Sequence, residues 1–260
     1  MNIVKSYLSD IEVLRNEYLD SLPVFQDIYL EFIVAEASCF KIVKGDDVIG
    51  YSIVAEGGLL VEFYINGRNI AIADECFSLM IKDLNIKSVF CKTFDFLLLD
   101  CCMSNNYGYD LIGCLFRDYI GNDLKHSSDL YVRLAVDSDL PFLMEQDDEV
   151  FEPKERLQEF INNKFIHLAC IENTIVGCGF LTRINQRYDF YDLGVWVNPD
   201  YRKKGYATMI MLFMIEICNK KNYTPICGCD INNNASRGML KKLGFISKYK
   251  LIEFSVSEIG

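Results

Sequence analysis

The chain has 260 residues, which is enough for one large domain or two of ordinary size. Hydrophobic residues make up 51% and charged residues 24%, a composition that excludes disordered and low-complexity proteins. The net charge of -11 argues against a nucleic-acid partner, because such a partner requires a basic surface.

The negative charge lies mostly in the first half of the chain. Residues 1–128 hold 10 Lys and Arg against 19 Asp and Glu, so that -9 of the total falls there. An acidic half of this kind either attracts a cationic small molecule or simply keeps the surface solvated.

Membrane and targeting segments are not expected. The longest apolar run, Met209 to Ile215, ends at Glu216 and is far shorter than the roughly 18 residues that a membrane span needs. The first ten residues lack a basic stretch followed by an apolar block, so we expect no signal peptide and a cytoplasmic protein.

The cysteines indicate reducing conditions rather than disulfides or zinc. There are 11, an odd number without a CxxC pair, and only two histidines accompany them. We therefore predict no metal site, and we expect four of the thiols to pack as small buried hydrophobic side chains: Cys101, Cys102, Cys227 and Cys229.

A hairpin pattern occurs twice along the chain. After a predicted helix from Ile11 to Asp20, residues 40–44 and 48–54 form two β-branched runs around the turn Gly45-Asp46-Asp47. In the second half, helices are predicted for 140–150 and 153–161, and the hairpin returns in residues 165–171 and 174–181. The chain is thus predicted to consist of two related halves.

In both halves the hairpin is followed by a strand, a helix, a strand, a further helix and a closing strand. This order predicts an α+β, or mixed α/β, fold in each half, with a mostly antiparallel sheet flanked by helices. We predict domains at residues 1–126 and 130–260, joined by the polar segment from Gly121 to Asp129.

The second half contains a candidate phosphate-binding loop. The predicted strand 190–197 ends at Asn198-Pro199, because proline cannot continue a sheet ladder. The loop that follows contains Gly205 and leads into an apolar helix, so free backbone N–H groups and the positive end of a helix dipole lie together. Three cations strengthen the attraction for a phosphate or pyrophosphate: Arg202, Lys203 and Lys204.

The surrounding sequence resembles the GNAT acetyltransferase superfamily. The loop reads Arg202-x-x-Gly205-x-Ala207, and it is followed by Asn233, Ala235 and the run Lys242-Leu243-Gly244-Phe245. The resemblance is clear over residues 130–256, and the first half follows it only in outline. It implies two GNAT-like folds in tandem.

The resemblance also implies acetyl-CoA as the acyl donor. Its contacts would be the strand backbone beside the pantetheine arm, the loop amides around the pyrophosphate, and one side chain: Val195, Val197, Arg202, Lys203, Lys204, Gly205, Tyr206, Ala207, Thr208 and Asn233. Simpler interpretations stay open, since Asn233 can cap the next helix, Gly205 can be an ordinary turn residue, and the lysines can be a solvated helix start.

The catalytic groups are less well specified. Many family members carry a tyrosine seven residues after the asparagine as an acid, but that position is Leu240 here. A general base is expected near the start of the 190–197 strand, where Tyr191 and Asp192 lie on opposite faces. The sequence does not decide which face meets the cleft.

The first half lacks the coenzyme loop. The positions that correspond to the loop are residues 70–75, which contain no glycine or cation and end in Asp74 and Glu75. These carboxylates would repel a pyrophosphate, so the N-terminal domain is expected not to bind the coenzyme.

The resulting hypothesis is an N-acyltransferase that moves acetyl from acetyl-CoA to an amine of a small molecule. One alternative is a catalytically impaired module that binds CoA or another metabolite, and a second is acetylation of a protein lysine or N-terminus. Transferases that use aminoacyl-tRNA are disfavoured by the acidic first half.

Overall fold

The computed structural model describes residues 1–121, 123–124 and 130–256, which form two compact units. Unit 1 comprises Met1–Leu115, Cys229–Asn232 and the final segment from Ser247, and unit 2 comprises Phe116–Gly228 and Asn233–Ile246. Most of the predicted linker, residues 122 and 125–129, lies outside the described residues.

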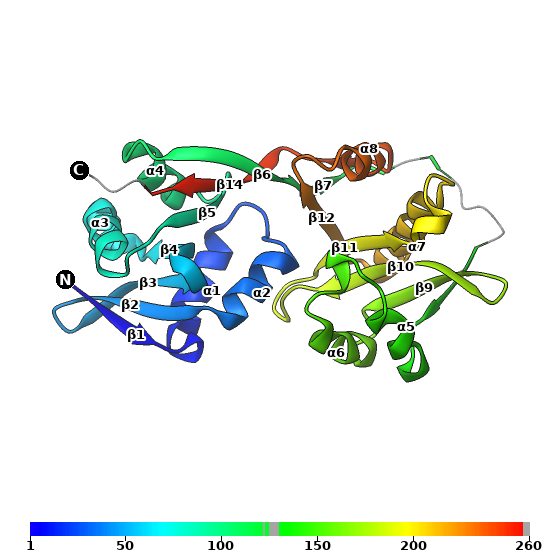
Figure 1. Ribbon diagram of the computed structural model, residues 1–260. Coiled ribbons are helices and arrows are strands. Elements are labelled where there is room, and N and C mark those ends of the chain that lie inside the picture. Colours follow the sequence, from blue (N-terminus) through cyan, green and yellow to red (C-terminus); the bar gives the residue numbers. More distant parts are fainter. Residues whose placement is uncertain (122, 125–129, 257–260) are drawn as a thin grey trace. The chain divides into compact units, whose positions relative to one another are not determined.

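Unit 1 is built on a sheet with the order β1-β2-β3-β4-β5-β14-β6 (Figure 1). All neighbours are antiparallel except β4 and β5, which run parallel. Its elements are β1 (Asn2–Ser6), α1 (Glu12–Ser21), α2 (Ile28–Glu36), β2 (Ser38–Lys44), β3 (Asp47–Ala55), β4 (Leu59–Ile65), α3 (Ala73–Asp83), β5 (Ser88–Lys92), α4 (Phe96–Ser104), β6 (Gly108–Phe116) and β14 (Tyr249–Ser255).

The strand β14 comes last along the described chain but lies inside the sheet of unit 1. It pairs with β5 through Leu251↔Lys92 and with β6 through Leu251↔Gly113 (Figure 1). Ile252 and Phe254 of β14 are buried in the core that α3 and α4 share with the sheet. Unit 1 is therefore assembled from segments at both ends of the described chain.

The alternation of side chains along β4 assigns the helices to the two faces of this sheet. Glu62 points to α1, where it accepts a hydrogen bond from Arg15 at 2.9 Å. Its neighbour Phe63 points to the other face and packs against Phe77 of α3, with ring centroids 5.3 Å apart. Polar contacts thus lie under α1, and the apolar core lies under α3.

Unit 2 has the strand order β8-β9-β10-β11-β12, antiparallel except for the parallel pair β11 and β12. A short ladder of β7 and β13 accompanies it. The elements are β7 (Asp118–Tyr119), β8 (Tyr131–Leu134), α5 (Leu140–Met144), α6 (Leu157–Asn162), β9 (Ile166–Ile171), β10 (Thr174–Arg183), β11 (Phe190–Val197), α7 (Tyr206–Lys221), β12 (Thr224–Asp230), α8 (Asn234–Lys242) and β13 (Phe245–Ile246).

Two of the predicted helices are shorter than expected. The helix predicted for 153–161 begins only at Leu157, after a 3-10 turn, Lys154–Arg156. The helix predicted for 140–150 ends at Met144, and a 3-10 turn, Glu149–Phe151, follows. Asp148 stabilises that turn, since its carboxylate accepts from the Val150 N–H at 3.3 Å and its carbonyl from the Phe151 N–H at 3.0 Å. Local side-chain bonding of this kind competes with helix continuation.

Two glycines let α7 lie close to the sheet. A Cβ atom on Gly179 would come within 2.9 Å of the side chains of Ile210 and Met214 in α7, and Gly177 is similarly confined. Their neighbours Cys178 and Phe180 point to the opposite face, into the core formed with α5 and α6. Unit 2 therefore also carries helices on both faces of its sheet.

The architecture confirms the predicted mixed α/β fold with two similar units. All 11 cysteines are free thiols, and Cys101, Cys102 and Cys227 are buried as expected, whereas Cys229 is partly exposed. Within the described ranges, no helix is long and apolar enough to cross a membrane. No group of three metal-ligating side chains occurs in that part of the chain either.

Candidate functional site

A pocket opens in unit 2 where two parallel strands cease to pair. β11 and β12 are paired from Phe190↔Thr224 to Asp192↔Ile226, and the pairing ends there. Beyond this point a pocket of about 550 Å³ is lined by the end of β11, the start of α7 and the start of α8. The last residues of β11 thus border the pocket.

The pocket brings together most of the residues that the sequence assigned to coenzyme binding: Val195, Val197, Arg202, Lys203, Gly205, Tyr206, Ala207, Thr208 and Asn233. Lys204 is not among the lining residues. Its ammonium donates to the carbonyl of Asp200 at 3.1 Å and lies 5.0 Å from the centre of the Tyr201 ring.

The loop before α7 has a conformation suited to an anion. Lys203 and Gly205 both have positive φ, 63° and 88°, and Gly205 occupies the N-cap position without a side chain to bond the first turn. Residues in left-handed conformation turn successive N–H groups toward one concave space. The N–H groups of Tyr206, Ala207 and Thr208 have no partner within the helix, and the helix dipole adds positive potential.

Arg202 connects this loop to two other segments. Its Nε donates to the carbonyl of Val197 at 2.9 Å, and its Nη2 pairs with the carboxylate of Asp148 at 3.2 Å. Both side chains of the ion pair are partly exposed, so the pair contributes at most about 1 kcal/mol. A phosphate can therefore replace Asp148 as the partner of Arg202 at little cost.

Asn233 has two roles available to it. Its side-chain oxygen accepts from the Ser236 N–H at 3.0 Å and so caps α8, as the simpler interpretation of the sequence proposed. The amide nitrogen still offers two donors to the pocket that the residue lines.

Several lining residues were missed by sequence reasoning: Asp148, Tyr201, Ala235, Ser236 and Met239. Ala235 and Ser236 follow from Asn233, because a helix that begins at the pocket presents its first turn to it, and Met239 lies one turn further along α8. Asp148 is 54 residues from its partner Arg202, and no sequence signal links the two.

The candidate catalytic residues lie beside the pocket rather than in its lining. Tyr191 is 8% exposed and stacks on Tyr223 with ring centroids 3.8 Å apart. Burial, together with Tyr223, raises the pKa of Tyr191 to about 12. Asp192 is 9% exposed, lies opposite Thr182 of β10 and points to the other face of the sheet. Leu240 is buried in α8.

Comparisons with known proteins agree with this geometry. A family model described as an acetyltransferase (GNAT) domain matches residues 7–119, and one described as the acetyltransferase (GNAT) family matches residues 131–245. No curated protein sequence shows a significant match to the chain.

Similar solved structures include whole-chain matches. An acetyltransferase from the GNAT family of Colwellia psychrerythraea has 20% sequence identity and a TM-score of 0.90, and the match covers 99% of this chain and 100% of that one. A tandem GNAT protein from the clavulanic acid biosynthesis pathway has 10% identity and a TM-score of 0.66, with 98% of each chain covered. A GCN5-related N-acetyltransferase from Sphaerobacter thermophilus has 12% identity and a TM-score of 0.57, with 94% of this chain and 84% of that chain covered.

Proposed function

The chain belongs to the GNAT acetyltransferase family, with one such domain in each half, and on that basis we propose that it transfers acetyl from acetyl-CoA to an amine of a small molecule. The observation that carries the proposal is the loop of unit 2. There, Gly205 at the N-cap of α7 and the side chain of Arg202 line a pocket of about 550 Å³.

The residues present fit the coenzyme. The first-turn amides of α7 and the guanidinium of Arg202 would hold the pyrophosphate. The β11 backbone from Val195 to Val197 would run beside the pantetheine arm, because its pairing with β12 has already ended. When bound, acetyl-CoA supplies an acyl thioester.

The acceptor amine must lose its proton before it attacks, and Asp192 is the better of the two predicted bases. A phenol whose pKa is raised to about 12 keeps its proton at neutral pH, which disqualifies Tyr191 as a base. Asp192 offers a carboxylate on the opposite face of β11, where it lies across from Thr182 of β10. We expect Asp192→Asn to slow acetyl transfer while leaving coenzyme affinity unchanged.

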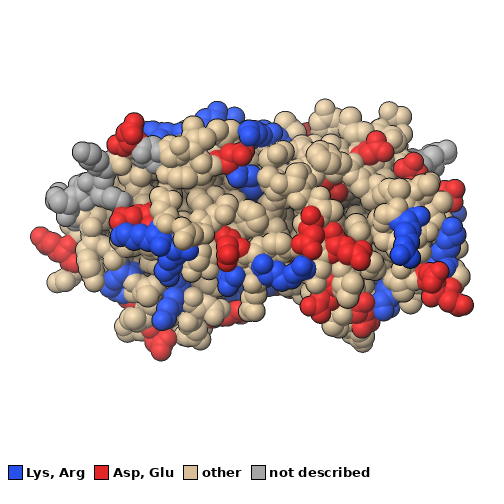
Figure 2. All heavy atoms as spheres, turned by 180° about the vertical axis from the view of Figure 1, so that it is seen from behind, with Lys and Arg blue, Asp and Glu red and all other residues tan. Residues whose placement is uncertain are grey.

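A small, neutral-to-basic acceptor suits the charge of the protein better than a nucleic acid does. On the face drawn in Figure 2, Lys and Arg side chains are interspersed with Asp and Glu side chains. Nucleic-acid binding requires a continuous basic surface.

We further propose that the protein works in the cytoplasm and uses no metal.

The test is a coenzyme titration that follows Trp196, the only tryptophan, which is one of the residues that line the pocket. Acetyl-CoA should change the Trp196 emission and raise the melting temperature. Arg202→Ala should weaken binding about tenfold or more, the effect of losing one charge-assisted hydrogen bond. Lys204→Ala is the matched control, since it removes the same charge from a side chain directed elsewhere.

A second candidate, a coenzyme-binding module without turnover, is favoured by Leu240. A buried leucine cannot protonate the departing thiolate. However, a thiol with a pKa near 8.5 leaves tolerably as an anion, so the acid is dispensable in principle. Release of free CoA thiol on addition of a panel of amines separates the two candidates, and peptides with a lysine or a free N-terminus in the same panel test protein acceptors.

A further inference from the structure

Unit 1 contains a pocket at the position that corresponds to the coenzyme pocket of unit 2. The parallel pairing of β4 and β5 ends at Leu60↔Val89, and a pocket of about 270 Å³ lies beyond, bordered by the ends of α1 and β4 and the start of α4. The helix after β4 begins with Asp74 and Glu75 in its first turn. A phosphate is therefore unfavourable here.

One polar group of this pocket is the carboxylate of Asp95. The residue is 3% exposed and lines the pocket. Its Oδ1 accepts from the Leu98 N–H at 3.3 Å, and its Oδ2 accepts from the Tyr18 hydroxyl at 2.6 Å. Lys92 donates to the same hydroxyl at 2.6 Å and lies 3.7 Å from the Asp95 carboxylate.

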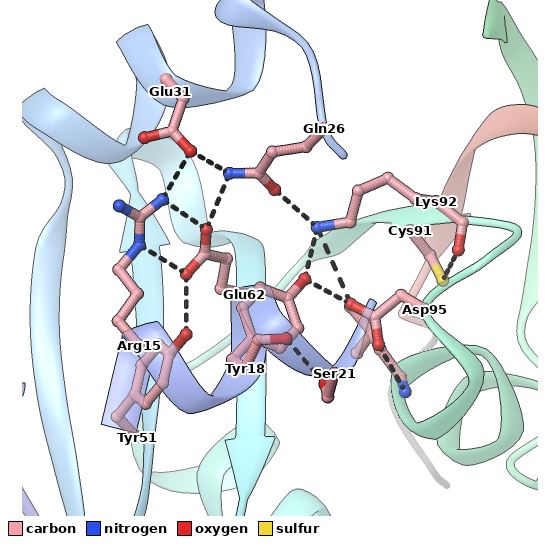
Figure 3. A network of polar contacts seen from close by, with 11 residues as sticks. Arg15, Tyr18, Ser21, Gln26, Glu31, Tyr51, Glu62, Cys91, Lys92 and Asp95 are labelled. Carbon is pink, nitrogen blue, oxygen red and sulfur yellow. Dashed lines mark hydrogen bonds and ion pairs between the residues drawn. The ribbon is translucent and has the colours of Figure 1, made fainter. Parts of the chain in front are cut away.

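The contacts of Asp95 continue into a buried network (Figure 3). Lys92 also donates to the side-chain carbonyl of Gln26 at 3.1 Å, and the Gln26 amide donates to Glu62 at 3.1 Å and to Glu31. Arg15 pairs with Glu62 at 2.9 Å and with Glu31 at 2.8 Å. Polar contacts thus connect Asp95, in the lining of the pocket, with α1 and α2.

The charges of this network do not balance. It joins two cations, Arg15 and Lys92, to three carboxylates, Glu31, Glu62 and Asp95. Of the three, Asp95 is 3% exposed, and burial raises its pKa because the charged form is costly away from water unless a cation compensates it. Among the three carboxylates, Asp95 is the one that borders the pocket, so a cation placed there would supply the missing charge.

The walls and the rim of the pocket suit the apolar part of an organic cation. Tyr18 and Tyr64, whose ring centroids are 6.0 Å apart, are among the lining residues, and aromatic rings attract cations. At the same pocket, Phe96 is 67% exposed and Ile70 is 50% exposed. Large exposed apolar side chains around a concave site with one polar group are typical of a ligand pocket.

We propose that the unit 1 pocket binds a small organic amine, with the ammonium group at Asp95 and the apolar body between Phe94, Phe96 and Ile70. The site is separate from the coenzyme loop and does not depend on acetyl transfer. It would give the half without a coenzyme loop a binding role of its own.

The test is calorimetric titration of the full chain, without acetyl-CoA, with phenethylamine and with phenethyl alcohol, which has the same body and no charge. The amine should bind at least about tenfold more tightly, the effect of a hydrogen bond between charged groups. Asp95→Asn should abolish this preference, since the amide keeps the helix-cap acceptor and removes the charge.

Three further variants show whether the amine is bound at Asp95 or elsewhere. Asp27→Asn is the matched control, because Asp27 is 6% exposed and caps α2 through the Leu30 N–H at 3.2 Å but does not line the pocket. Asp192→Asn tests whether the amine instead occupies unit 2. Neither change should alter the preference, whereas Phe96→Ala, a change at an exposed residue, should weaken both probes several-fold.

Some outcomes would overturn the proposal. Equal affinity for the two probes would mean that Asp95 carries its own proton, and no heat of binding at millimolar amine would mean that the pocket does not take this class of ligand. Loss of the preference in Asp27→Asn or Asp192→Asn would place the amine elsewhere. The Trp196 titration reports on unit 2 independently, so a failure here is distinct from a failure of the proposed function.

Discussion

Replacing Gly205 by alanine tests whether the left-handed backbone at the N-cap of α7 is required. Gly205 has φ 88° and ψ -4°, and an added Cβ would meet only the end of the Met209 side chain, at 3.7 Å. Since this distance is an ordinary contact, the cost comes from the backbone conformation. It amounts to about 1–2 kcal/mol for a residue with a Cβ.

Gly238→Ala provides a control with the opposite sign. Gly238 lies inside α8, and a Cβ there would have no atom within 4 Å. Alanine in a helix interior is about 1 kcal/mol more favourable than glycine, so this variant should be more stable than the parent. The two alanine variants should therefore differ by about 2–3 kcal/mol in the free energy of unfolding.

Urea unfolding of both variants, combined with acetyl-CoA titration, measures the effect. If the loop around Gly205 relaxes to avoid the unfavourable conformation, the loss of stability will be smaller, but the N–H groups will no longer converge and coenzyme affinity will fall. The reasoning is refuted if Gly205→Ala matches the parent protein in both stability and affinity.

Three other substitutions test separate features. Asn233→Ala should lower stability by about 1 kcal/mol because α8 loses its cap, a change that thermal unfolding detects. Burial lowers the pKa of His167 from 6.5 to about 4, so its contribution to stability is complete above pH 6.5 and declines, by up to about 3 kcal/mol, as the pH falls toward 4. His167→Gln should flatten that part of the stability profile, and a profile as steep as the parent's would contradict the assignment. Glu62→Gln should cost about 3 kcal/mol at neutral pH in urea unfolding, because Arg15 stays buried with less compensating charge, and an unchanged stability would show that the pair contributes nothing.

The parts of the site that the sequence predicted are those encoded by neighbouring residues. The end of β11 at Asn198-Pro199 and the turn at Gly205 depend on local backbone chemistry, and both lie where the pattern indicated. The fold class followed from the order of predicted elements for the same reason.

The features that the sequence did not predict depend on contacts between distant residues. Arg15 and Glu62 are 47 residues apart, and nothing near either residue indicates that the other will neutralise it. The direction of Tyr191 and Asp192 was left open because alternation along a strand assigns opposite faces but does not identify them. The packing of Tyr191 against Tyr223 identifies the two faces.

The position of β14 has a consequence for how the protein is made. A ribosome synthesises this strand after every other described strand, so β5 and β6 must wait for the partner that belongs between them. Until then both strands present unpaired edges, which are templates for association with other chains. Nascent or truncated chains that stop before β14 should therefore be prone to aggregation and dependent on chaperones, even though most of their first domain has long been translated.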